Sequence, residues 1–120
     1  MVKIHRLDIV MVNLDPTLGS EIKKSRPCVV ISPNIINYNS KVVTIAAITS
    51  HTEEKEVSLL FVPIQANGST GLKKKSLVTL MQIRTIDKAR ITNKLGKFPI
   101  QFNENLSYAI KLATGLEKIT

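Results

Sequence analysis

The chain has 120 residues, of which 43% are hydrophobic and 22% are charged, a balance that indicates one globular domain over residues 1–120 and excludes a disordered chain. The 17 basic residues outnumber the 9 acidic residues, and the net charge of +8 makes nucleic acid a candidate partner. No run of about 18 apolar residues is present to cross a membrane, and the single cysteine, Cys28, excludes an internal disulfide. A reducing cytoplasm is the expected location.

Apolar runs bounded by turn residues predict strands along the first two thirds of the chain. The predicted strands span residues 8–14, 27–32, 42–48, 57–64, 76–82 and 90–95. The run 42–48 is almost continuously apolar, so both of its faces are expected to be covered. A turn is predicted at residues 67–71, and the polar cluster at residues 37–40 is expected to close the second strand as a loop.

The last part of the chain changes its hydrophobic period. Apolar residues recur there at the spacing of one helix face: Leu106, Ala109, Ile110, Ala113 and Leu116. Asn103 is the expected N-cap and Gly115 the expected C-cap. Short strands followed by one helix predict a mainly β fold, a small twisted antiparallel sheet or half-open SH3-like barrel with the C-terminal helix packed on it.

Several classes of chemistry find no support in the residues. The sequence lacks the spacings of a metal site and the glycine-rich loops of nucleotide sites, so neither a metal nor a cofactor is expected. Cys28 lies in an apolar run, which favours core packing over a nucleophile. For His51, a solvated loop histidine is favoured over a proton shuttle.

Three segments at predicted strand ends remain as candidates for a site: residues 19–27, 48–50 and 82–88. Arg26 stands directly before Pro27, where its guanidinium could bind an anionic group through two N–H groups. From spacing alone, a surface or structural ion pair is the favoured role for Arg26. Arg84 and Asp87 are expected to pair and brace a turn.

The order of short motifs along the chain resembles the MazF/PemK toxin family. The matching segments are residues 8–10 (DIV), 13–16 (NLDP), 19–21 (GSE), 26–31 (RPCVVI), 46–50 (AAITS) and 82–88 (QIRTIDK). Each motif alone is weak, but together they cover nearly the whole chain at the spacing of the family. The resemblance implies a CcdB/PemK-like half-open barrel that forms homodimers.

The resemblance also implies an activity. Members of this family are metal-independent endoribonucleases that cut single-stranded RNA at short sequences and leave 2′,3′-cyclic phosphate and 5′-hydroxyl ends. They are the toxin half of a toxin–antitoxin pair, so a cognate acidic antitoxin is the implied partner. The key arginine of the family falls on Arg26 and its key threonine on Thr49, the expected catalytic residues. The implied substrate-binding residues are Ser20, Glu21, Lys23, Lys24 and Ser50.

The sequence departs from the family at several positions. Leu7 stands where members usually have glycine, and Ile22-Lys23-Lys24 replaces the usual glutamine followed by glycine. Met81 stands where some members carry an acid, so no catalytic carboxylate is expected there. The run Lys73-Lys74-Lys75 could extend an RNA track, but a solubilising loop is favoured.

Two other functions remain open on the sequence. A toxin of the related CcdB type would bind and poison DNA gyrase through its C-terminal helix without catalysis, but the tail 116–120 lacks the ending associated with that type. A plain nucleic-acid-binding module could use the charge of +8 without cutting any strand.

Overall fold

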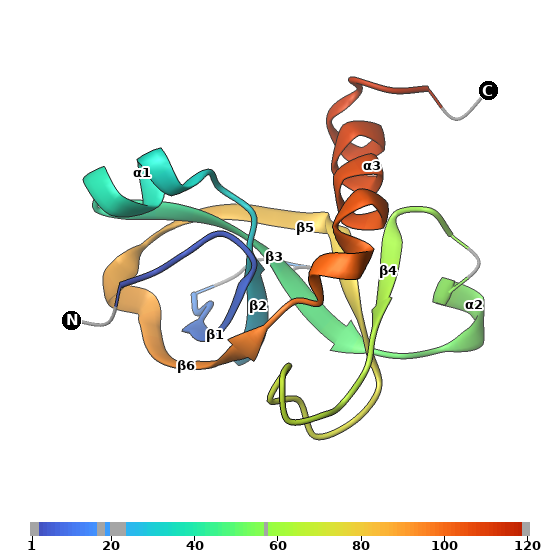
Figure 1. Ribbon diagram of the computed structural model, residues 1–120, viewed down its shortest axis with the longest axis horizontal. Coiled ribbons are helices and arrows are strands. Elements are labelled where there is room, and N and C mark those ends of the chain that lie inside the picture. Colours follow the sequence, from blue (N-terminus) through green and yellow to red (C-terminus); the bar gives the residue numbers. More distant parts are fainter. Residues whose placement is uncertain (1–2, 17–18, 20–23, 57, 119–120) are drawn as a thin grey trace.

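Six antiparallel strands form one sheet in the computed structural model, which describes residues 3–16, 19, 24–56 and 58–118 (Figure 1). The strands are β1 (Asp8–Asn13), β2 (Ser25–Val30), β3 (Val42–Ser50), β4 (Phe61–Ile64), β5 (Ser76–Asp87) and β6 (Ile91–Lys97). Their order across the sheet is β4-β5-β3-β2-β1-β6. The helices are α1 (Asn34–Asn39), α2 (Glu53–Glu56) and α3 (Asn103–Thr114), with short 3-10 turns η1 (Lys88–Arg90) and η2 (Ile100–Phe102). The predicted mainly β fold with a C-terminal helix is confirmed.

The alternation of side chains along the strands divides the core into two clusters, one on each face of the sheet. On β3, Ala46 and Ile48 pack into one cluster, and Ile45 and Ala47 pack into the other. Both faces of β3 are therefore covered, as the continuous apolar run predicts. The register of β3 against β5 shifts between Ala46, which pairs with Ile83, and Ile48, which pairs with Val78, so the pairing is irregular ahead of the last residues of β3.

Two predicted elements are wrong in part. The predicted strand 57–64 begins only at Phe61, because residues 58–60 form a turn, in which the N–H of Phe61 donates to the carbonyl of Ser58 at 3.1 Å. Val57 lies outside the described residues. The predicted loop at residues 37–40 belongs largely to α1. Asn37 is buried there, and its Nδ2 donates to the carbonyl of Ser32 at 2.9 Å, so an asparagine that looked like a turn residue anchors a helix.

Helix α3 rises over the end of the sheet that contains β4 and β5 (Figure 1). Leu106 and Ala109 are buried in the cluster that includes Val62 and Ile64 of β4, whereas Ala113 and Leu116 are exposed. Ile110 is half-buried and packs against the same cluster, so the predicted apolar face is covered as far as Ile110 and exposed beyond it. None of the helices among the described residues has the length and apolar content to span a membrane.

The predicted caps of α3 have different outcomes. Gly115 lies at the C-cap with a left-handed φ of 81°, as predicted. The predicted N-cap is wrong, because Asn103 is the first residue of the helix and its side-chain oxygen accepts a hydrogen bond from Arg6 Nη1 at 3.0 Å. Asn103 therefore ties the helix to the segment before β1.

Among the residues that the structure describes, two that are not glycine have a left-handed backbone: Leu7, with a φ of 75°, and Lys24, with a φ of 66°. The backbone of Lys24 closes the base of the β1–β2 connection, since its N–H donates to Asp15 Oδ1 at 2.9 Å and its carbonyl accepts from Leu14 N at 3.1 Å.

Candidate active site

A pocket of about 260 Å³ opens where the ends of β2 and β3 meet the loop before β5. Its lining comes from β1, β2, β3, β5, β6 and this loop: Met11, Arg26, Pro27, Ile48, Thr49, Ser50, Gly71, Leu72, Lys73, Lys74, Ser76 and Leu95. The pocket therefore brings together Arg26, Thr49 and Ser50, which come from two of the three segments singled out in the sequence. All of its charged lining residues among those described are cationic.

The sheet register explains why Arg26 and Thr49 meet. Strands β2 and β3 are antiparallel, with Cys28 opposite Ala47 and Val29 opposite Ala46. The paired region ends at Cys28 and Ala47. Arg26 and Thr49 each lie two residues beyond this pair on their own strand, so the two strands bring both residues to the same end of the sheet, where they line one pocket.

Arg26 differs from the other arginines in what its guanidinium contacts. Arg6 donates to the carbonyl of Ile31, Arg84 to that of Leu14, and Arg90 to that of Asn13. The exposed guanidinium of Arg26 makes no hydrogen bond or ion pair with any residue in the described ranges. It is therefore available to an anion, and the structural ion pair that spacing alone favoured is not formed with these residues.

The hydroxyls at the end of β3 are available in the same way. Thr49 is half-buried and Ser50 is exposed, and neither hydroxyl group has a protein partner within the described part of the chain. Each can donate a hydrogen bond to a phosphate oxygen or accept one from a sugar hydroxyl. The pocket thus combines one cation and two hydroxyls, none of which has a partner among the described residues.

Cys28 lies beside Arg26 on β2 but takes no part in the pocket lining. Its side chain is fully buried, and burial raises the pKa of the Cys28 thiol to about 12, although the nearby guanidinium groups of Arg26 and Arg84 act in the opposite direction. A thiol that stays protonated at neutral pH is a poor nucleophile. The expected role in core packing is confirmed.

The remaining predicted site residues either lie outside the described residues or do not line the pocket. Ser20, Glu21 and Lys23 lie outside the described residues. Lys24 is exposed and is not among the lining residues of the pocket. His51 directly follows β3 and is half-buried, also outside the lining.

The expected pair of Arg84 and Asp87 is wrong. Arg84 Nη1 donates to the carbonyl of Leu14 at 2.8 Å, and Asp87 Oδ1 accepts from the N–H of Ala89 at 2.8 Å at the start of η1. Residues three apart in a strand point to opposite faces of the sheet, so the two side chains cannot meet.

Sequence reasoning undervalued the lysine run at 73–75. Lys73 and Lys74 line the pocket together with Arg26, where a solubilising loop was the favoured interpretation. Gly71, two residues before the run, indicates a turn, but nothing in the sequence shows which backbone that turn packs against. Among the described residues, no group of three or more histidine, cysteine, aspartate and glutamate side chains is arranged to hold a metal ion.

Comparison with known proteins decides the family. Residues 5–114 match the model of the PemK-like, MazF-like toxin of type II toxin–antitoxin systems. The chain belongs to this family. Membership in the MazF/PemK family favours an RNA-cutting toxin over the gyrase-binding alternative. It also agrees with the predicted CcdB/PemK-like fold.

Individual relatives extend across nearly the whole chain. The chain is 32% identical over 113 residues to Endoribonuclease EndoA of Bacillus subtilis, covering 94% of this chain and 96% of that protein. Among solved structures, toxin MazF-mt6 of Mycobacterium tuberculosis superimposes with a TM-score of 0.76 at 23% identity, covering 92% of this chain and 99% of that chain. An endoribonuclease in complex with its cognate antitoxin, from Mycobacterial species, gives a TM-score of 0.73 at 19% identity, covering 98% and 99%.

Proposed function

We propose that this MazF/PemK-family chain is a sequence-specific, metal-independent endoribonuclease that cuts single-stranded RNA, as the toxin of a type II toxin–antitoxin system. Cleavage leaves a 2′,3′-cyclic phosphate on one fragment and a 5′-hydroxyl on the other. The observation that carries the proposal is the free guanidinium of Arg26 in one pocket with the free hydroxyl of Thr49. Its relative EndoA is named an endoribonuclease, which supports the same class of reaction.

The reaction needs little from the protein beyond positioning and charge. The 2′-oxygen of one nucleotide forms a bond to the adjacent phosphorus, and the bond from phosphorus to the 5′-oxygen of the next nucleotide breaks. The 2′-hydroxyl loses its proton and the departing 5′-oxygen gains one, so neither water nor a redox partner is consumed. Because the nucleophile belongs to the substrate, no metal is needed to generate it.

Arg26 and Thr49 take different roles in this step. Negative charge builds up on the phosphoryl oxygens in the transition state, and a fixed cation aimed at them stabilises it. An arginine remains protonated in proteins, so Arg26 acts as this cation and donor rather than as a base. The hydroxyl of Thr49 hydrogen-bonds the phosphate or the attacking 2′-hydroxyl and holds it in line.

The substrate extends beyond these two residues. We propose that Ser50, Lys24 and the residues Ser20, Glu21 and Lys23 of the β1–β2 connection bind flanking nucleotides. Ser50 supports this most directly, since it lines the same pocket. We also propose that residues 1–120 act as one toxin domain in the cytoplasm, where its RNA substrates are found.

The proposed partners are a cognate acidic antitoxin and a second copy of the chain. The endoribonuclease of Mycobacterial species, which shares the fold, was solved with its cognate antitoxin. The net charge of +8 would accelerate association with an acidic antitoxin. Exposed apolar side chains on and around α3 support a protein interface there: Leu59, Ile100, Phe102, Tyr108 and Leu116.

The test is to incubate the purified chain with a long single-stranded RNA in the presence of EDTA and to map every new end by sequencing. The proposal expects cuts at one recurring short sequence, with 2′,3′-cyclic phosphate and 5′-hydroxyl ends. Ends that require added Mg²⁺, or 3′-hydroxyl ends, would contradict the mechanism. An intact RNA across several unrelated sequences would contradict the activity.

A further inference from the structure

The loop between β4 and β5 has a defined conformation that its own hydrogen bonds hold. Thr70 is completely buried, and its hydroxyl donates to the carbonyl of Gln65 at 2.7 Å. Asn67 Oδ1 accepts from the N–H groups of Ser69 at 2.9 Å and Thr70 at 3.0 Å. These bonds fix the tip of the loop in one conformation before the chain reaches the lysine run.

The loop is also attached to β6. The N–H of Lys97 donates to the carbonyl of Ser69 at 2.8 Å. A Cβ on Gly96 would lie 2.3 Å from the same carbonyl oxygen, so glycine is required for this approach. Leu72 then packs against the core cluster of the sheet face that carries Ile9 and Val29. The backbone on either side of Gly71 is therefore held in place over the sheet.

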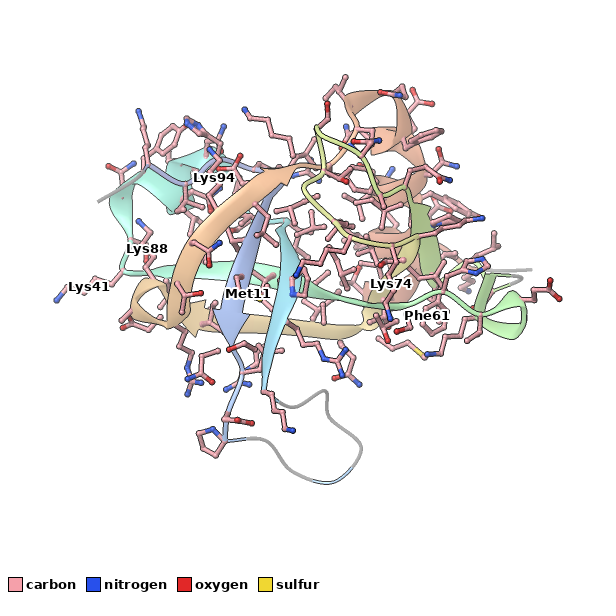
Figure 2. The ribbon with its side chains drawn as sticks, turned by 90° about the horizontal axis from the view of Figure 1, so that it is seen from below. Met11, Lys41, Phe61, Lys74, Lys88 and Lys94 are labelled. Carbon is pink, nitrogen blue, oxygen red and sulfur yellow. The ribbon has the colours of Figure 1, made fainter. Side chains whose placement is uncertain are left out.

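This arrangement places Lys73 and Lys74 on the lining of the pocket that contains Arg26. Figure 2 shows Lys74 on the side of the molecule away from Lys41, Lys88 and Lys94. Both side chains are exposed, and neither ammonium group has a hydrogen bond or ion pair with a residue of the described ranges.

Lysines elsewhere in the described residues differ in this respect: Lys97 is also exposed without a side-chain partner, whereas Lys94 and Lys88 are engaged. Lys94 Nζ forms an ion pair with the buried carboxylate of Asp8 at 3.0 Å. Lys88 Nζ donates to the carbonyl of Asn37. Two free ammonium groups held beside a free guanidinium, with no acid in the described lining, thus form a local concentration of uncompensated positive charge. Such a cluster has a direct electrostatic reason to bind phosphates.

We propose that Lys73 and Lys74 form a phosphate-binding pair that holds the RNA backbone next to the linkage at Arg26. This proposal rests on the RNA-cutting function proposed above. It adds substrate binding as the task of the loop between β4 and β5. The anchored loop fixes the backbone of the two lysines, so less conformational freedom is lost when they bind. The contribution is to substrate binding, and the chemical step remains with Arg26 and Thr49.

The test measures binding to a single-stranded RNA of mixed sequence whose 2′-hydroxyls are all methylated, because this probe keeps its phosphates and cannot be cut by 2′-hydroxyl attack. The wild-type chain is compared with Lys73→Ala/Lys74→Ala and with the control Lys41→Ala/Lys111→Ala. The control removes the same charge from exposed lysines outside the pocket lining. Affinity is measured as a function of salt concentration for each protein.

The proposal expects the slope of log K against log salt to fall in magnitude by about 1.4 in Lys73→Ala/Lys74→Ala, which corresponds to binding about 25-fold weaker at 0.1 M salt. The double arginine variant Lys73→Arg/Lys74→Arg should restore the slope. An unchanged slope, or an equal loss in the control, would overturn it. Cleavage of unmodified RNA by the wild type is scored separately, so failure of the proposed function and failure of the lysine pair give different results.

Discussion

The backbone of Gly71 lies directly against the carbonyl of Leu95 on β6. A Cβ added at Gly71 would lie 2.1 Å from the carbonyl oxygen of Leu95 and 2.8 Å from its carbon, and the φ of Gly71 is 71°. Both the space and the left-handed backbone therefore require glycine. This contact joins the loop that carries Lys73 and Lys74 to the strand behind the pocket.

Gly71→Ala is predicted to destabilise the fold by at least about 2 kcal/mol, from the left-handed backbone and the overlap with Leu95 together. RNA affinity should fall as well, because the lysine loop must move away from β6. Gly68→Ala is the matched control in the same loop, since a Cβ there meets nothing within 4 Å. Thermal unfolding and RNA binding of the two variants check the prediction, and equal behaviour would contradict it.

Thr49 offers a test of its hydroxyl that leaves its shape nearly unchanged. Thr49→Val keeps the branched side chain in β3 but removes the hydroxyl, so cleavage should fall by about 100-fold or more with little change in stability, the range for a lost transition-state donor. Thr49→Ser keeps the hydroxyl and should retain most activity. Cleavage rates at saturating RNA measure both, and an active Thr49→Val would remove the hydroxyl from the mechanism.

Leu7 combines a buried side chain, which favours a large apolar residue, with a left-handed backbone, which favours glycine. Leu7→Ala should lose about 2–5 kcal/mol of packing and keep the backbone cost. Leu7→Gly loses the same packing but relieves a left-handed conformation that costs about 1–2 kcal/mol in other residues. Leu7→Gly is therefore expected to be the more stable of the two, the reverse of the usual order. Chemical denaturation of both proteins decides it.

Cys28 makes stability depend on pH in the alkaline range. Its folded-state pKa is raised to about 12 from an ordinary value of 9.0, because burial disfavours the thiolate. The stabilisation is fully present below pH 9, is lost progressively as pH rises above 9, and is gone above the folded-state pKa. Cys28→Ala should lose less stability than the wild type between pH 8 and pH 11, as measured by denaturation. A parallel fall in both proteins would argue against this assignment.

The strands could be predicted from sequence because apolar periodicity reports burial directly. The run 42–48 indicated a strand covered on both faces, and β3 is one. Periodicity could not place α1, because Asn37 is buried through hydrogen bonds to Ser32 that depend on the fold. It also could not show that β5 continues to Asp87, since residues 83–87 are half polar and are paired along β3.

The candidate site was predictable only where a motif carried it. Arg26 and Thr49 came from the resemblance, and the sheet register then explains why residues from separate strands meet. Lys73 and Lys74 could not be predicted, because their place in the pocket depends on glycine contacts between a loop and β6 that have no pattern in one sequence. The pair of Arg84 and Asp87 failed because strand geometry separates residues three apart.

The most direct test of the account is cleavage of single-stranded RNA in EDTA by the wild type, Arg26→Ala and Arg26→Lys. Arg26→Ala is expected to fold with unchanged thermal stability, since the guanidinium of Arg26 has no partner in the described ranges, and to cut at least about 100-fold more slowly. Arg26→Lys keeps the charge without the planar fork and should be intermediate. Full activity in a folded Arg26→Ala would contradict the central claim that this guanidinium stabilises the transition state.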